Sequence, residues 1–140
     1  MANFTTRAPP QAQQNSLISY EVASRQPVSV YYSGASMPWS SFNQQFQGNY
    51  LLAWIEMPNN VWDINAAAPQ GTWVRELIYV PESGNLTLNR SSGGSTINRD
   101  YGYTMPGYRY VWFYVDKKGT HVSVFTLGGL QSSEVTISAY

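Results

Sequence analysis

The sequence lacks cysteine altogether and is poor in charged residues, which make up 11% of its 140 positions. Without cysteine the chain can form neither a disulfide framework nor a thiolate metal site. Cysteine content therefore does not indicate whether the protein works in an oxidising or a reducing compartment. The eight basic and eight acidic residues balance, and they form no basic stripe that would neutralise phosphates. Nucleic acid is therefore not expected as a partner.

Long apolar runs are missing as well. The sequence has no stretch of about 18 apolar residues, and residues 1–7 lack the apolar core of a signal peptide. We therefore expect no transmembrane segment in this chain. A chain that begins after a removed signal or anchor would show the same pattern.

Aromatic residues, by contrast, are abundant at 15%. Disordered chains combine high charge with few aromatic residues, so most of this chain is expected to fold, and its length suits one domain. Residues 1–16 are different because they are polar, rich in Gln and interrupted by Pro9 and Pro10, which favours an extended arm. The predicted organisation is an arm over 1–16 and a single domain over 17–140.

The domain has the pattern of an all-β protein. Short stretches rich in Val, Ile, Tyr, Trp and Thr alternate with turn residues, and no long window keeps a helical period. About nine such strands indicate an antiparallel β-sandwich or a barrel. The predicted strands are 17–23, 27–33, 50–56, 61–65, 72–80, 85–90, 108–115, 120–127 and 134–140. Residues 33–48 are expected to be a loop with one helical turn, and residues 91–95 a flexible turn.

The clearest local prediction is a hairpin at 116–119, which joins 108–115 to 120–127 and needs a positive φ at Gly119. The last strand, 134–140, is expected to return beside it. The prediction includes one shared core made by alternate residues of these three strands: Val111, Phe113, Val122, Val124, Val135 and Ile137.

This C-terminal block resembles the last three strands of immunoglobulin-like domains in exported proteins of bacteria and archaea. The resemblance is carried by Asp116-Lys117-Lys118-Gly119, the strand to Phe125, and Gly128-Gly129. Here the corner is one residue longer, and His121 stands where tyrosine is usual. Residues 50–140 are also similar to small β-sandwich domains in surface proteins of methanogenic archaea. The resemblance implies an immunoglobulin-like sandwich in an extracellular or cell-surface setting, and it carries no catalytic motif.

The strongest functional hint is an aromatic stripe on the strand at 108–115. Alternation places Val111, Phe113 and Val115 on one face of this strand. The opposite face carries Tyr108, Tyr110, Trp112 and Tyr114. Four exposed rings would exceed the apolar patch that a soluble monomer normally shows. The stripe is therefore expected to be covered by a segment of the same chain, by a partner subunit or by a flat sugar.

Catalytic chemistry has little support in the sequence. His121 is the only histidine, and at a strand start it is expected to make structural hydrogen bonds. The acidic residues are isolated, so neither a metal site nor a cofactor is expected. A pair of carboxylates for glycoside hydrolysis could still be formed in the fold by two of the residues Glu56, Asp63, Glu76 and Asp100.

The leading hypothesis is a non-catalytic extracellular or cell-surface module that associates with copies of itself or with neighbouring surface domains. Phe4 would anchor the arm against aromatic residues of another subunit, or else against Tyr110 and Trp112 of its own chain. The alternative is a carbohydrate-binding module, with Trp39, Trp62 and the 108–114 stripe as a platform for a glycan. A hydrolase is the third, least favoured reading.

Overall fold

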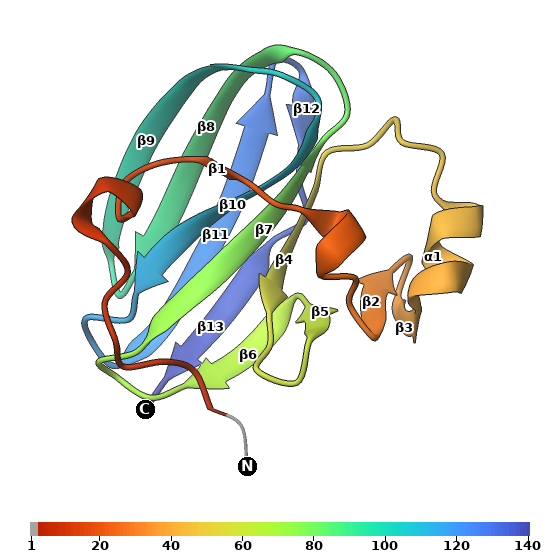
Figure 1. Cartoon of the computed structure of the whole chain (residues 1–140). Helices are drawn as coiled ribbons and strands as arrows, with labels where there is room; N and C mark the ends of the chain where they lie inside the picture. The colour runs from red at the N-terminus through yellow and green to blue at the C-terminus, as the bar shows by residue number, and fades with distance from the viewer. Residues whose placement is uncertain (1–2) are drawn as a thin grey trace.

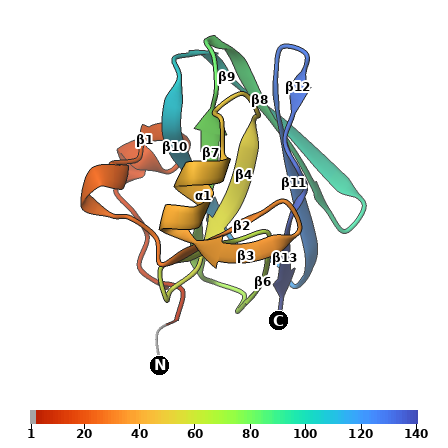
Figure 2. The ribbon, with the colours of Figure 1, turned by 90° about the vertical axis from the view of Figure 1, so that its right-hand side faces the viewer.

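The structure is a computed structural model and describes residues 3–140, so the first two residues of the predicted arm lie outside it. Two β-sheets pack face to face, which confirms the all-β sandwich (Figures 1 and 2). Most neighbouring strands are antiparallel, and the pairs β2–β5 and β6–β13 are parallel. No helix within residues 3–140 is long and apolar enough to cross a membrane.

The first sheet, called sheet A, has seven strands in the order β1-β10-β7-β4-β5-β2-β3. Their bounds are β1 Ile18–Ser19, β2 Ser29–Tyr32, β3 Ala35–Pro38, β4 Leu52–Glu56, β5 Val61–Asp63, β7 Trp73–Val80 and β10 Gly107–Tyr114. The second sheet, called sheet B, has the order β6-β13-β11-β8-β9, with β12 paired to β11. Its strands are β6 Asn65–Ala68, β8 Gly84–Ser92, β9 Ser95–Thr104, β11 Gly119–Leu127, β12 Leu130–Gln131 and β13 Val135–Ala139.

Within residues 3–140, helical structure is confined to three short elements outside the sheets. The 3-10 helix η1 spans Gln11–Gln13, η2 spans Val22–Ser24, and α1 spans Trp39–Gln45. The position of α1 agrees with the helical turn expected between residues 33 and 48. Its one fully buried residue, Phe42, faces the outer side of sheet A.

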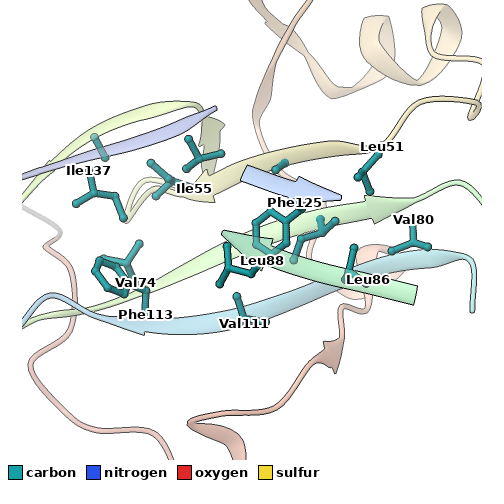
Figure 3. Packing of buried hydrophobic residues seen from close by; sticks show 14 of the residues in the cluster. Leu51, Ile55, Val74, Val80, Leu86, Leu88, Val111, Phe113, Phe125 and Ile137 are labelled. Carbon is teal, nitrogen blue, oxygen red and sulfur yellow. The ribbon is translucent and has the colours of Figure 1, made fainter. Parts of the chain in front are cut away.

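Between the sheets lies one apolar core, because alternate residues of both sheets point inward. Figure 3 shows Val74, Val111 and Phe113 of sheet A opposite residues of sheet B. These are Leu88, Phe125 and Ile137. The expected faces of β10 and β13 are therefore confirmed. The aliphatic side chains of this core are buried. The other face of sheet A carries most of its aromatic residues.

The predicted hairpin at 116–119 is wrong. Gly119 has the expected positive φ of 111°, but β10 belongs to sheet A and β11 to sheet B. The segment crosses from one sheet to the other and therefore joins no paired strands. The sequence pattern cannot separate these two cases, since a turn inside one sheet and a crossing between two sheets need the same residues.

The inward face of β11 is also the reverse of the prediction. His121, Ser123, Phe125 and Leu127 are buried, while Val122 and Val124 are only half-buried on the outer side. The apolar Val residues suggested the wrong face because the inner face accepts His121 and Ser123, which find buried polar partners. The remaining members of the predicted shared core lie where expected.

Candidate functional site

A second, aromatic cluster covers the outer face of sheet A. Its buried members are Tyr20, Val30, Phe42, Trp54, Trp62, Leu77 and Tyr110. Tyr20 follows β1 and meets Trp62 edge to face at 5.6 Å and Tyr110 edge to face at 6.1 Å. In Figure 2, α1, β2 and β3 lie over β4 and β7 on this side of the molecule. Segments of the same chain therefore enclose most of this face.

The predicted stripe divides into a covered and an open part. Tyr108, Tyr110 and Trp112 belong to the aromatic cluster, and Tyr114 at the end of β10 is 44% exposed. Burial, aided by the nearby Tyr79, raises the pKa of Tyr108 well above its ordinary value of 10. The covering comes from the chain itself, which is one of the three possibilities that the sequence left open.

The two tryptophans of the predicted sugar platform are not arranged as a platform. Trp62 has 0% exposure, and Trp39 packs against it at 5.6 Å with an interplanar angle of 72°. Because Trp62 is buried and half-buried Trp39 meets it edge to face, the two rings form no shared flat surface for a sugar.

Phe4 lies on its own domain. It is half-buried and packs against the core between the sheets, rather than in the aromatic cluster that holds Tyr110 and Trp112. The neighbouring Thr5 carbonyl accepts a hydrogen bond of 2.8 Å from the Trp73 amide. Asn15 accepts a hydrogen bond of 2.6 Å from Arg99 on β9. The described part of the predicted arm is therefore fastened to both sheets.

Beside Phe4 lies a cleft of about 500 Å³, at the open end of the stripe. At its base Glu56 contacts two guanidinium groups, with Arg25 at 3.4 Å and Arg75 at 3.3 Å. The Tyr20 hydroxyl donates a hydrogen bond of 2.7 Å to the same carboxylate. Burial, and then this bond, raise the pKa of Tyr20 above 10, so the hydroxyl stays a donor at neutral pH. Glu56 is thereby held in one position.

Aromatic rings line the cleft beside this ionic group. The Arg75 guanidinium lies 4.7 Å from the ring centres of both Tyr110 and Trp112. Trp73 also lines the cleft, and its ring pairs with Tyr114 at 4.8 Å. Arg75 Nε and Trp112 Nε1 are buried nitrogens with no hydrogen-bond partner among residues 3–140. Buried donors without a partner are few in native proteins; Trp62 Nε1, outside the cleft, is another.

Only Phe4 and Trp112 of the residues predicted for interaction line this cleft. Arg25, Trp73 and Arg75 were not predicted as site residues, and Glu56 was named only as a possible carboxylate for glycoside hydrolysis. A signal for three of them is present in the sequence, because Glu56, Trp73 and Arg75 occupy the outer face of strands that also carry large aromatic side chains. Charged groups on such a face need solvent or partners. Arg25 lies in a loop, and no pattern indicates it.

A second open surface is the free edge of sheet B. β9 pairs with β8 on one side, and no strand within residues 3–140 pairs with the other. Ile97 on β9 is 52% exposed and Tyr103 is 70% exposed. Residues 95–100 pair regularly with β8, and a β-bulge follows between the partners Leu86 and Thr87. This edge therefore presents backbone donors and acceptors together with apolar side chains.

The polar groups inside the core are linked to one another. Fully buried Glu76 of β7 forms an ion pair with Arg90 of β8, and the Ser123 hydroxyl donates a hydrogen bond of 2.7 Å to Glu76. His121 Nε2 donates to the Lys117 carbonyl at 2.8 Å, so Nδ1 accepts from Ser92 at 2.6 Å. The expected structural hydrogen bonding of His121 is thus present. Both groups lie inside the sandwich. The Glu76 group joins its two sheets, whereas His121 and Ser92 both belong to sheet B.

No protein-family model and no curated protein matches the chain. The functional interpretation therefore depends on the cleft and the free edge.

Proposed function

We propose that this protein is a non-catalytic module that associates with copies of itself, as part of a larger assembly, through the free edge at β9. The observation that carries this proposal is the length and openness of that edge. β9 spans ten residues and contains neither Lys nor Pro, two residues that natural proteins use to block edge pairing. Such an edge can add a strand from another chain.

The other sheet edges are poorer candidates. β1 at one edge of sheet A has two residues, and β3 at the opposite edge has four and ends at Pro38. β6 at the far edge of sheet B has four residues. Short edges offer few consecutive hydrogen bonds to an incoming strand, and Pro38 lacks the backbone donor as well.

A second copy of the chain fits the β9 edge in a definite register. A two-fold pairing centred on Ile97 brings the two Ile97 side chains together and sets Arg99 opposite Ser95. A pairing centred on Arg99 would instead oppose two guanidinium groups, which is unfavourable. The zero formal net charge of the chain also adds no long-range repulsion between copies. We therefore favour the register centred on Ile97.

We also propose that the sandwich is of the immunoglobulin-like type. An immunoglobulin-like sandwich at the cell surface or outside the cell fits the C-terminal resemblance and a module that assembles through strand edges. The aromatic stripe, which first suggested self-association, no longer supports it because the chain covers most of that face. Self-association is supported instead by the free edge at β9.

Sedimentation velocity across a range of protein concentrations tests this function. We expect the unaltered protein to show concentration-dependent association, and Ile97→Lys to reduce it strongly, because a charge on the edge disfavours strand pairing. Val28→Lys is the matched control, since Val28 is 68% exposed and lies outside sheet B. A protein that stays monomeric at all concentrations would contradict the proposal, as would equal association of the two variants.

The rival functions gain less from the geometry. A glycan platform at Trp39 and Trp62 is disfavoured because Trp62 is buried and half-buried Trp39 meets it edge to face. A hydrolase centred on His121 is disfavoured because His121 and Ser92 are both buried, which keeps a substrate away from them. We therefore propose no catalytic activity.

A further inference from the structure

We infer that the cleft beside Glu56 binds a saccharide that carries a carboxylate, of the uronic acid class. This inference goes beyond self-association and uses a different surface from β9. It also differs from the predicted sugar platform, of which only Trp112 contributes here. Three features carry it: the walls of the cleft, its uncompensated charge and the rigidity of the groups around it.

The walls of the cleft match the chemistry of a sugar ring. Its volume of about 500 Å³ lies within the range of small-molecule sites. Trp73, Trp112 and Phe4 supply aromatic surface against which C–H groups of a sugar can pack. Asn3, Gln26 and Asn60 also line the cleft, and amide groups can pair with the hydroxyl groups of a sugar.

The charge of the cleft specifies an acidic ligand. Its lining contains two cations, Arg25 and Arg75, and one anion, Glu56, so one positive charge is left over. The Arg75 guanidinium lies against the Tyr110 and Trp112 rings, at 4.7 Å from each ring centre. The Arg25 side chain is 49% exposed and contacts Glu56 only through Nη2. Nε and Nη1 make no contact with Glu56, so each can donate a charge-assisted hydrogen bond to a ligand carboxylate.

The surrounding groups are fixed in place. Glu56 is held by Tyr20 and Arg75 and in turn orients Arg25. On the opposite wall, residues 57–61 form a tight turn closed by hydrogen bonds between Met57 and Val61 and between Asn60 and Met57. Asn60 has a positive φ of 62° and donates its side-chain amide to the Gln26 carbonyl at 2.8 Å. A site arranged in this way loses little entropy when it binds a ligand.

Calorimetric titration with trigalacturonate tests the inference. We expect trigalacturonate to bind, and its fully methyl-esterified form and glutarate to bind at least tenfold more weakly, because the first lacks the charge and the second lacks the rings. Arg25→Gln should weaken trigalacturonate binding at least tenfold. Arg7→Gln, a change at an exposed arginine outside the cleft, should change it less than twofold.

The position of the ligand is tested by NMR on the five tryptophan indole signals, assigned through single Trp→Phe variants. Binding in the cleft should shift the Trp73 and Trp112 signals and leave that of buried Trp54 unchanged. The inference is overturned by an absence of binding, by equal affinity for the methyl ester, by an unaffected Arg25→Gln variant, or by shifts that exclude both Trp73 and Trp112. A circular dichroism spectrum shows that each variant is folded.

Discussion

At the scale of single residues, the most consequential group in the core is the buried carboxylate of Glu76. A charge removed from water is costly unless it is paired and hydrogen-bonded. Here Arg90 and Ser123 reach it from sheet B, and the Arg90 guanidinium also lies 3.9 Å from the centre of the Phe113 ring. The sheets are therefore linked by a polar contact that only one relative placement satisfies.

Glu76→Gln is expected to lower the free energy of unfolding by about 3 to 5 kcal/mol, because the Arg90 charge then stays buried without a counter-charge. The measurement is urea unfolding followed by tryptophan fluorescence. The combined variant Glu76→Leu, Arg90→Met, Ser123→Ala removes every polar member and should recover most of the loss. A combined variant that is less stable than Glu76→Gln would contradict this expectation. It would mean that Glu76, Arg90 and Ser123 together stabilise the fold, rather than only offsetting the cost of burying one another.

At the scale of the element, β10 separates two environments along its length. Val111 and Phe113 enter the core between the sheets, while Tyr110 and Trp112 enter the aromatic cluster. A central strand with large side chains on both faces is usually buried on both. The period-2 pattern predicted this division, although it could not indicate what covers the aromatic side.

Phe113→Ala should lower the free energy of unfolding by about 3 to 5 kcal/mol, because it leaves a cavity between the sheets. Tyr114→Ala on the next position is the matched control, since Tyr114 is 44% exposed, and it should cost clearly less. Thermal and chemical unfolding of both variants give the comparison. Similar costs for the two substitutions would contradict the division of the strand into two faces.

The sequence predicted the strands that are rich in β-branched and aromatic residues and missed the polar ones. β9 was not predicted because Ser95–Thr104 contains Asn, Arg, Asp and Gly, which are rare in buried strands. At an edge, pairing with one neighbour is enough for such residues. β3 and β6 were missed for another reason: each has four residues, none of them β-branched or aromatic.

The cleft could be predicted only in part. Local patterns place Trp112, Arg75 and Glu56 on outward strand faces, but their meeting depends on the order β10-β7-β4 in sheet A. Arg25 and Phe4 come from irregular segments, whose paths depend on tertiary contacts. No periodicity in the sequence encodes such paths.

At the scale of the whole molecule, the N-terminal segment acts as a strap across the sandwich. It bonds to β7 through Thr5, contacts β9 through Asn15 and pairs with β10 through β1. In Figure 1 it runs from the lower end of the sandwich past β9 before it reaches η2. The first of the two sheets therefore depends on contacts from a region that is polar in sequence.

Deletion of residues 1–14 should lower the free energy of unfolding by about 1 to 3 kcal/mol, through lost burial of Phe4 and the lost hydrogen bond to Trp73. We expect the particle size, measured by light scattering, to stay that of the full chain, because β9 is retained. Phe4→Ser provides the milder comparison and should show a smaller loss of stability. A smaller particle after the deletion would instead mean that the arm holds a second copy.

The way the strands are ordered also bears on how the protein is made. Within residues 3–140, β1 at residues 18–19 pairs only with β10, and β6 at 65–68 pairs only with β13 at 135–139. As the chain leaves the ribosome, β8 and β9 can pair as soon as both have emerged, whereas β6 cannot pair until residues 135–139 have been synthesised. Domains dominated by such distant pairings fold in roughly milliseconds to seconds. The free β9 edge is therefore present in the nascent chain before the sandwich can close, which makes crowded synthesis the moment of greatest risk for mispairing.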